Sequence, residues 1–456
     1  MTSSEVRISW GKLAAFGTPA VGAGYMYLFL SLYVMKFSTD VLLIAPVFMG
    51  LIFSVSRIWD AISDPLVGYL SDRTVTPLGR RRIWLLTSVI PISVTFYMVF
   101  APPLGLTKGQ LDWWMAVSII GFYSSMTLFF VPHMALGAEM TDDYHERNKL
   151  FGARHFAYAF GSILSLVSMH LLIVAEFGEE TDVRALAEEL AILAVAVMSV
   201  FLVFAVFMLK ERPEFQGRMT SAPFSAFKDV WQNSHARLFI VVQFIENVGS
   251  AAIAALTLYV MQYVVGAPHL AVPVILTYFI PSSLSVPLWI PLAKRFGKIR
   301  MWVISMIGTG FSFGAFCLLP FIDSMEVRIA ISFVFAFFAG LAAGCGGMIG
   351  PSVQSDIVDY DELVSGERKE GSYFAAWNFV QKSAVGVMLL LTGFVLQFSG
   401  FVPNIDQTQE VKIAIVGLYG LFPLVCYFIG AYMFSKFQLD EVACNDIRKQ
   451  LELKRA

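Results

Sequence analysis

The chain has 456 residues, of which 57% are hydrophobic and only 14% carry a charge, and its formal net charge at pH 7 is -2. Soluble domains contain about 25% charged residues, so this composition excludes a soluble globular protein and indicates a polytopic membrane protein. The near-neutral charge gives no reason to expect a nucleic-acid partner. The 4 cysteines do not have metal-ligand spacing, so neither a metal site nor a disulfide framework is expected.

Twelve segments are long and apolar enough to cross a bilayer, which takes about 20 mostly apolar residues. In chain order they lie near 14–38, 45–71, 84–103, 111–138, 151–175, 185–209, 238–265, 270–293, 302–322, 327–351, 372–399 and 411–435. The sequence therefore predicts an all-α membrane protein with twelve transmembrane helices.

The longest polar connection divides these helices into two sets of six. We expect an N-terminal six-helix bundle over 1–210, a cytoplasmic middle loop over 211–237, a C-terminal six-helix bundle over 238–435 and a cytoplasmic tail over 436–456. The two halves contain similar motifs. The turn that begins at Gly79 recurs at Gly297, and the acidic motif that begins at Asp143 recurs at Asp359, at nearly the same offset. Parallel halves of this kind place a solute path at their interface near the bilayer midplane.

Basic residues indicate the orientation, because cytoplasmic loops are enriched in Lys and Arg. Almost all Lys and Arg residues outside the predicted helices lie in connections on one side. The opposite connections carry only Lys36, Lys108, Arg184, Arg328 and Lys412. This asymmetry places both termini and the middle loop in the cytoplasm.

Two aspartates lie inside the second predicted helix. An ionised carboxylate near the middle of a bilayer is costly unless it is paired or faces a watery cavity. Arg57, Asp60 and Asp64 share one helix face, so Arg57 can pair with Asp60. The oxygens of Asp60, Ser63 and Asp64 suit a hard cation, so we predict that Asp60 and Asp64 bind sodium. The same residues could bind a proton instead. A purely structural alternative is a buried ion-pair network with no cation.

Two more ionisable residues lie deep in predicted helices. Lys382 is expected to pair with an aspartate of the second helix, and breaking this pair on cation binding would couple the cation to the solute. A static pair that only holds the two helices together is the alternative. Glu246 either lines the cavity or is protonated and hydrogen-bonded.

The basic turn after the second helix predicts a cytoplasmic latch. A glycine permits a tight turn, and the arginines that follow Gly79 can bridge to acids of the next loop, such as Asp142, Asp143 or Glu146. The second half repeats the arrangement, although these charges could also serve only to set the topology. The predicted latch residues are Asp72, Arg73, Gly79, Arg80, Arg81, Asp143, Glu146, Arg147, Asp359 and Glu362.

Several of these motifs together carry a family resemblance. The run from Arg57 to Arg73, the turn 79–82, the Val131-Pro132 pair, the motif 143–147 and the motif 356–362 resemble the glycoside–pentoside–hexuronide:cation symporters (melibiose-carrier-like) of the major facilitator superfamily. The resemblance covers nearly the whole chain. It implies the major facilitator fold of two six-helix pseudo-repeats, and it does not name the solute, because substrates vary widely in this family.

The resemblance also implies roles for individual residues. It places the sodium ion between Asp60, Asp64 and Thr127, with Ser63 alongside and Lys382 close by. The positions that hold a sugar in such carriers depart from the family pattern. The first helix offers Thr18 and no acid, the fourth offers Phe130 and Met134, and the fifth offers Arg154 or His155.

These departures bear on the solute. Buried hydroxyls of a sugar need polar partners, and one unpaired buried group costs about 1–3 kcal/mol, so apolar replacements suit an amphiphile better. The Phe-x-Val-Pro pattern of the fourth helix is similar to that of vertebrate sodium-dependent lysophosphatidylcholine symporters. The predicted substrate cavity is lined by Thr18, Phe130, Met134, Arg154, His155, Glu246, Tyr373 and Trp377.

The sequence thus predicts a secondary active transporter that couples sodium or a proton to symport of a glycoside-like or amphiphilic organic solute by alternating access. A sodium-coupled lysophospholipid symporter and a cation-independent facilitator are the alternatives. No catalytic motif is present, so an enzyme is not expected. We expect a multi-pass protein of the bacterial cytoplasmic (inner) membrane, whose partners are the solute and the lipid bilayer, with no cofactor beyond the co-transported cation and no obligate protein partner.

Overall fold

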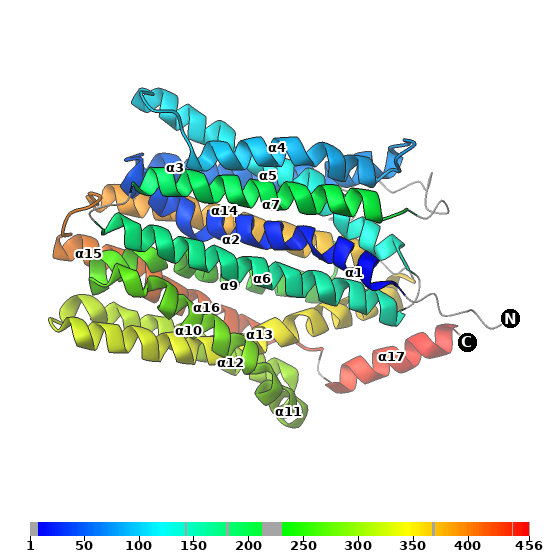
Figure 1. The fold of residues 1–456 in the computed structure, drawn as a ribbon. Coiled ribbons are helices and arrows are strands. Elements are labelled where there is room, and N and C mark those ends of the chain that lie inside the picture. The colour runs from blue at the N-terminus through cyan, green and yellow to red at the C-terminus, as the bar shows by residue number, and fades with distance from the viewer. Residues whose placement is uncertain are drawn as a thin grey trace. The chain divides into compact units, whose positions relative to one another are not determined.

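A computed structural model of the chain describes residues 8–141, 144–178, 182–211, 230–366, 370–439 and 441–455. All regular elements within these ranges are helices (Figure 1). Eleven of them are long and apolar enough to cross a membrane, and a bent pair makes a twelfth when it is counted as one span. The predicted all-α membrane fold is therefore confirmed.

The chain folds into two compact units, which are described separately. The N-terminal unit comprises Met1–Ile44 and Val55–Pro223, and the C-terminal unit comprises Ala45–Ser54 and Phe224–Ala456. The first turns of one helix thus group with the C-terminal unit. The predicted boundaries of the two six-helix bundles stay a prediction.

Helices of the N-terminal unit run side by side along most of their length (Figure 1). Its elements are α1 (Trp10–Gly17), α2 (Pro19–Lys36), the π-helical turn η1 (Phe37–Val41), α3 (Pro46–Arg73, shared with the other unit), α4 (Arg82–Phe100), α5 (Lys108–Glu139), α6 (Tyr144–Glu176) and α7 (Val183–Met208). A ladder of buried aromatic rings, in which Phe29 contacts Phe100 and Phe96 contacts Phe122, fills its interior.

Glycines allow α2 and α6 to approach closely. A Cβ atom on Gly24 would collide with the carbonyl oxygen of Tyr158, and one on Gly161 would collide with that of Val21. Each helix therefore presents bare backbone to the other, which is how small residues tighten helix pairs in membranes.

The C-terminal unit begins with the first turns of α3. Its other elements are α9 (Ser234–Tyr259), η3 (Val260–Val265), η4 (Pro268–Leu270), α10 (Ala271–Leu284), α11 (Val286–Phe296), α12 (Lys298–Gly314), η5 (Ala315–Phe321), α13 (Met325–Ser365), α14 (Glu370–Phe398), α15 (Gln409–Val416), η6 (Gly417–Leu421), α16 (Phe422–Phe434) and α17 (Glu441–Arg455). Close packing recurs between α10 and α13, where Gly340 lies against the carbonyl of Tyr278 and Gly344 against that of Ser282.

One predicted span is bent. The segment 270–293 forms α10 and α11, and the stretches Pro268–Leu284 and Val286–Phe296 meet at 49°. Proline removes a backbone donor and its ring displaces the carbonyl four residues earlier. Pro287 follows the break directly, and Pro281 and Pro291 flank it, so the bend has a local cause in the sequence.

Three helices extend beyond the predicted membrane segments. Asp359 and Glu362, expected in a loop, lie on the last turns of α13, which continues to Ser365. Glu146 and Arg147, also expected in a loop, lie in the first turns of α6. The tail contains α17. Hydropathy detects only the apolar part of a helix, so polar extensions of this kind were missed.

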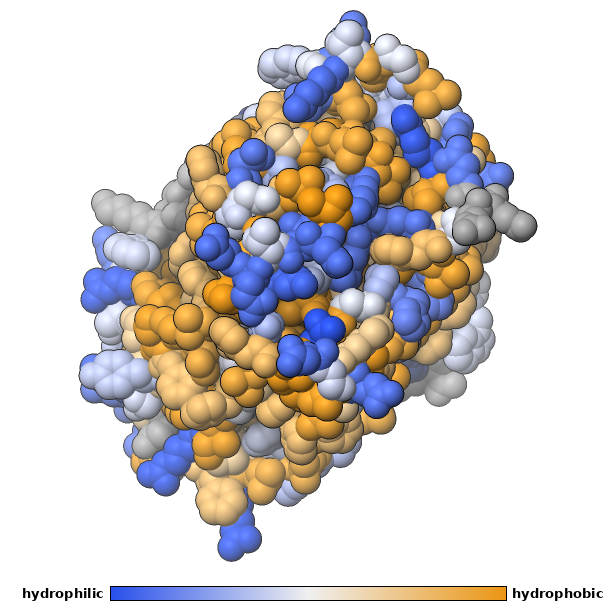
Figure 2. Space-filling model, turned by 90° about the vertical axis from the view of Figure 1, so that its left-hand side faces the viewer, coloured by the Kyte–Doolittle hydropathy of each residue, from blue (hydrophilic) through white to orange (hydrophobic). Residues whose placement is uncertain are grey.

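Large apolar side chains are exposed on the outside of both units. Ile90 and Trp113 in the first, and Leu284 and Phe311 in the second, are more than half exposed. Figure 2 shows many hydrophobic residues on the surface in view, beside hydrophilic ones. Exposed apolar surface on this scale marks contact with lipid, which agrees with an integral membrane protein.

Substituting Gly161 with alanine tests the close approach of α2 and α6. The added methyl group would force the helices apart, so Gly161→Ala should lower the free energy of unfolding by about 1–3 kcal/mol. Gly152 on the same helix has nothing within 4 Å of an added Cβ, so Gly152→Ala should be neutral or stabilising by up to about 1 kcal/mol. Thermal unfolding of the purified variants measures both, and equal melting temperatures would contradict the packing argument.

Candidate functional site

Helix α3 carries a row of charged and polar residues along the N-terminal unit. Asp60 and Ser63 are buried, with 1% and 7% of their surface exposed, and Asp64 is half-buried. The hydroxyl of Ser63 donates to the backbone carbonyl of Asp60 at 3.2 Å. The helical spacing thus brings two carboxylates to one place inside a membrane-spanning helix.

Thr127 on α5 meets both carboxylates. Its Oγ1 lies 2.9 Å from Oδ1 of Asp60 and 3.0 Å from Oδ1 of Asp64, and Oγ of Ser63 lies 3.5 Å away. A hydroxyl has one proton and can donate to only one of the two carboxylates at a time. The cluster therefore has more hydrogen-bond acceptors than donors. A small cation or an added proton would stabilise it.

Arg57 is the basic neighbour of this cluster. One of its nitrogens lies 3.9 Å from Oδ2 of Asp60, and another donates to the hydroxyl of Tyr123 at 2.7 Å. The guanidinium also lies over the Tyr123 ring, 4.1 Å from its centroid. Arg57 is thus shared between a carboxylate and an aromatic ring. The indole of Trp59 donates to Ser124 at 2.8 Å and fixes α3 against α5 at this level.

Lys382 lies on α14 in the C-terminal unit, whereas Asp60 and Asp64 lie in the N-terminal unit. Their expected pairing stays a prediction. The same holds for its role in coupling.

The basic turn between α3 and α4 pairs with acids of its own unit. Arg80 donates to Glu139 at 2.7 Å, and Arg81 contacts both Glu139, at 3.0 Å, and Asp72. The arginines thus pair with Glu139, which was not among the expected acids. The expected bridges to Asp142, Asp143 or Glu146 stay predictions. Glu139 ends α5 just beyond the predicted span, so a charged residue at a helix end was the available signal.

Glu211 also holds this turn, and no sequence pattern pointed to it. Its carboxylate accepts the backbone N–H groups of Arg80, Arg81 and Arg82, each at 2.8 Å. These groups precede and begin α4, where a helix leaves backbone donors without internal partners. Gly79 has a φ of +118° and faces the Glu211 carboxylate where a side chain would stand, so glycine suits this position.

The remaining predicted latch residues make other contacts. Arg73 stacks over Tyr69, 4.1 Å from its ring centroid. Glu146 accepts from the backbone of Ile8 at 2.9 Å and from Lys149 at 2.6 Å, and Arg147 donates to the carbonyl of Thr141 at 3.0 Å. Asp143 lies outside the described residues.

A related contact occurs in the C-terminal unit. Lys298, at the start of α12, forms an ion pair with buried Asp356 of α13 and approaches Ser352 at 3.3 Å. Asp359 and Glu362 follow on the same helix. A basic turn thus meets an acidic helix end in each unit.

The predicted cavity residues of the N-terminal unit lie on three spans. Thr18 marks the break between α1 and α2, and Oγ1 of Thr18 is buried without a hydrogen-bond partner. The guanidinium of Arg154 lies over the Phe130 ring, 4.9 Å from its centroid. Met134 is half-buried on α5, and His155 is exposed on α6.

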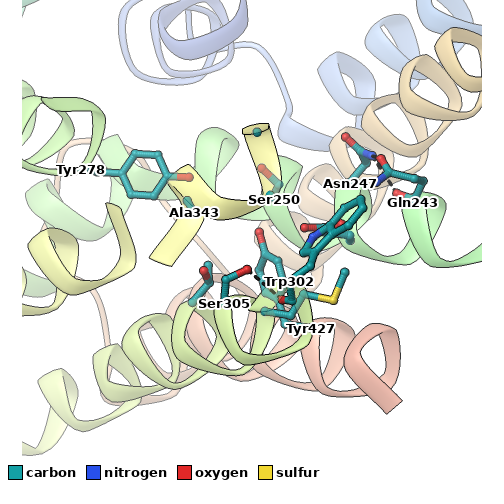
Figure 3. A pocket seen from close by; sticks show the side chains of 13 residues that line it. Gln243, Asn247, Ser250, Tyr278, Trp302, Ser305, Ala343 and Tyr427 are labelled. Atoms are coloured by element: carbon teal, nitrogen blue, oxygen red, sulfur yellow. Dashed lines mark hydrogen bonds between the residues drawn. The ribbon is translucent and has the colours of Figure 1, made fainter. Parts of the chain in front are cut away.

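The predicted cavity residues of the C-terminal unit are Glu246, Tyr373 and Trp377. Glu246 lines a cavity of about 310 Å³ between α9, α10, α12, α13 and α16 (Figure 3). Tyr373 and Trp377 do not line it, because they belong to the hydrophobic core, with 0% and 5% of their surface exposed. Their place in a substrate cavity stays a prediction. Tyr373 accepts a hydrogen bond from Asn233 at 3.0 Å.

A buried ion cluster escaped sequence analysis. Lys36, assigned to an exposed connection, is 1% exposed, and its Nζ lies 2.6 Å from both carboxylate oxygens of Glu176 and 3.2 Å from Asp40. The only local signal was the Lys36–Asp40 spacing of one helical turn. This cluster ties the end of α2 to the end of α6.

Comparison with known proteins gives a match over most of the chain. The family model described as MFS/sugar transport protein matches residues 15–441. The inner membrane symporter YicJ of Escherichia coli is 28% identical, over 89% of this chain and 86% of that protein. The putative glycoside/cation symporter YagG of the same organism is 26% identical, over 97% and 94%. The sodium-dependent lysophosphatidylcholine symporter 1 of Xenopus tropicalis is 23% identical, over 93% and 86%.

Among solved structures, the nucleoside transporter NupG superposes with a TM-score of 0.66, covering 94% of this chain and 100% of that one at 12% identity. At this identity the likeness concerns the fold alone. Together with the relatives, it confirms the resemblance drawn from the motifs.

Removing the Glu211 carboxylate tests the support of the basic turn. Glu211→Ala should lower the free energy of unfolding by about 2–3 kcal/mol, because hydrogen bonds to charged groups contribute about 1.5–3 kcal/mol and three donors lose their acceptor. Glu189→Ala removes an exposed carboxylate from α7 and serves as the matched control. Thermal unfolding gives the comparison, and the same melting temperature for both variants would show that Glu211 does not hold the turn.

Proposed function

Since the chain belongs to the MFS/sugar transport protein family, we propose that it couples the movement of a cation to symport of an organic solute. It is an integral membrane transporter of the major facilitator fold. We propose below which cation it uses, which class of solute it carries and which residues bind them.

The convergence of Asp60, Asp64 and Thr127 carries the proposal. Oγ1 of Thr127 lies 2.9 Å from Oδ1 of Asp60 and 3.0 Å from Oδ1 of Asp64, and a nitrogen of Arg57 lies 3.9 Å from Oδ2 of Asp60. Two adjacent carboxylates repel each other unless a cation or a proton lies between them. A bound cation therefore stabilises this cluster, and its release restores the repulsion.

Sodium fits the donor set better than a proton. A proton needs one carboxylate and a hydrogen-bond acceptor, whereas Asp60, Asp64, Thr127 and Ser63 provide a group of oxygens from two helices. Hard cations are bound by such oxygens. Sodium dependence stated in the name of the Xenopus relative is consistent with this choice.

Coupling is assigned to the charges around the site. Arg57 relaxes toward Tyr123 or toward Asp60 as the charge of the cluster changes, because it already contacts both. Lys382 is proposed as the second counter-charge. The contacts of Arg80 and Arg81 with Glu139 and Asp72 act as the cytoplasmic latch that opens and closes during alternating access.

The solute is proposed to be glycoside-like or amphiphilic. The name of YagG supports a glycoside, whereas the Xenopus relative and the apolar Phe130 and Met134 support a lysophospholipid or another amphiphile. The name of YicJ supports a bacterial inner membrane as the location, and both termini are proposed to face the cytoplasm.

Sodium binding can be tested without knowing the solute. Sodium chloride at about 100 times its dissociation constant should stabilise the purified protein by about 2.7 kcal/mol relative to potassium chloride at equal ionic strength. Asp60→Asn, Asp64→Asn and Thr127→Val should remove this stabilisation, and Ser63→Ala should reduce it. Asp323→Asn, an exposed loop acid, should retain it. Stabilisation that survives in all three site variants would refute the assignment.

Coupling is tested by uptake into proteoliposomes. A thermal-shift panel of glycosides, lysolipids and amphiphilic acids identifies the solute to be used. An inward sodium gradient should then raise the internal solute concentration above the external one, and a pH gradient should do so if the proton alternative holds. Equilibration without accumulation under either gradient would indicate a facilitator and reject symport.

A further inference from the structure

A second cavity of the C-terminal unit lies beside the turn that joins α11 to α12. Its volume of about 700 Å³ falls within the range of ligand sites, which is about 300–1,000 Å³. Its walls come from α11, the start of α12, the second half of α13 and the segment that joins α16 to α17. It shares no lining residue with the cavity that Glu246 lines, so it is a separate space.

Basic side chains outnumber acidic ones in the wall of this cavity. Lys294 lies in the last turn of α11, and Lys298 and Arg300 lie in the first turn of α12. Among the described residues that line the cavity, Asp356 is the one acid, and it is buried and forms an ion pair with Lys298. Lys294 and Arg300 are exposed and form no ion pair within the described ranges. Two positive charges therefore border the cavity without an acidic partner there.

Gly297 brings the two basic helix ends together. It stands between the last residue of α11 and the first residue of α12, and its φ of +87° lies in the left-handed region that favours glycine. Lys294 and Lys298 thus lie on either side of one tight turn and border the same space. Arg295, also in the last turn of α11, is exposed and adds a further positive charge to this end of the helix.

Apolar side chains form the rest of the wall and continue along α11. Ile290 and Phe296 line the cavity and are exposed, and Leu288 of α11 and Leu284 of α10 are exposed further along the same surface. Helix α11 also leaves the direction of α10 at 49° (Figure 1). A helix with exposed apolar side chains and a basic end is typical of the boundary between lipid tails and head groups.

This combination of charge and apolar surface discriminates between ligand classes. Inorganic phosphate could pair with Lys294 and Arg300, but it would leave the apolar walls unused. A zwitterionic phospholipid carries its own ammonium group, which compensates its phosphate. An anionic phospholipid fits both features, because its phosphate forms charge-assisted hydrogen bonds with the basic groups while its glycerol and acyl chains lie against Ile290 and Phe296. Charges that only set the topology would need no cavity.

We propose that the cavity beside Gly297 binds the head group of an anionic phospholipid of the surrounding bilayer, with Lys294 and Arg300 as its charge partners. The turn 294–300 belongs to the connections that are predicted to face the cytoplasm, and anionic lipids attract basic segments at that surface. The assignment depends on the membrane location of the chain and not on the cation or the solute that it carries.

Binding of single lipids to the full-length protein in detergent tests the proposal, and native mass spectrometry gives the affinity of the first bound lipid. Phosphatidylglycerol should bind about tenfold or more tightly than phosphatidylcholine with the same acyl chains. Lys294→Gln and Arg300→Gln should each weaken the binding of phosphatidylglycerol by about fivefold, and together by about thirtyfold, because each basic residue at an anionic lipid surface contributes a factor of this size.

A matched control separates the cavity from a general effect of charge. The double variant Lys12→Gln/Arg237→Gln removes the same charge from exposed positions on α1 and α9 and should retain the wild-type affinity. Without added lipid, the Lys294→Gln/Arg300→Gln variant should melt at the wild-type temperature, because both side chains are exposed. Inorganic phosphate at millimolar concentration should not displace phosphatidylglycerol.

Three results would overturn the proposal. The first is equal affinity for phosphatidylglycerol and phosphatidylcholine. The second is a Lys294→Gln/Arg300→Gln variant that binds phosphatidylglycerol as tightly as the control variant does. The third is displacement of the lipid by millimolar phosphate, which would identify a site for free anions. The sodium measurement keeps these outcomes separate from the proposed symport, because Lys294 and Arg300 are not among the proposed cation ligands.

Discussion

The cost of placing charge inside a membrane span is the constraint on which this structure depends. An ionised group there must find an opposite charge, a hydrogen-bond partner or a cation. The N-terminal unit meets this need in two ways. Lys36 lies 2.6 Å from Glu176 and 3.2 Å from Asp40, so that cluster compensates most of its own charge. In the cluster of Asp60, Asp64 and Thr127, oxygens from two helices converge and Arg57 lies 3.9 Å from Oδ2 of Asp60. We propose that this cluster is the one that uses a mobile cation.

Helix packing supplies the rigid frame for these clusters. Gly24 and Gly161 bring α2 and α6 into backbone contact, and the same helices carry the two ends of the Lys36–Glu176 pair. In the C-terminal unit, Gly340 and Gly344 join α13 to α10. Close backbone contact leaves little freedom for helices to slide, so a change of conformation is more easily absorbed at breaks such as that between α10 and α11.

The sequence could predict features that depend on local periodicity. Hydropathy located the candidate membrane-spanning segments in the described part of the chain, and helical spacing placed Arg57, Asp60 and Asp64 on one face. The converging position of Thr127 came from the family resemblance, because no local pattern links residues on different helices.

What the sequence could not predict were contacts between distant segments. Glu211 supports a turn 130 residues away, and Glu176 pairs with Lys36 across 140. Both acids look like ordinary charges at the ends of apolar segments. The polar ends of α6 and α13 were missed for a related reason, because a helix that leaves the membrane loses its hydropathy signal while keeping its backbone hydrogen bonds.

The positions that hold a sugar in the carriers which this chain resembles carry small or apolar side chains here. Thr18, Phe130 and Met134 offer one hydroxyl group among them, and the hydroxyl oxygen of Thr18 is buried without a hydrogen-bond partner in the described part of the chain. One polar group of a solute could satisfy this hydroxyl. Further hydroxyl groups of a solute would need partners on other residues, because an unsatisfied buried polar group costs about 1–3 kcal/mol. The three positions by themselves therefore favour an amphiphile over a sugar.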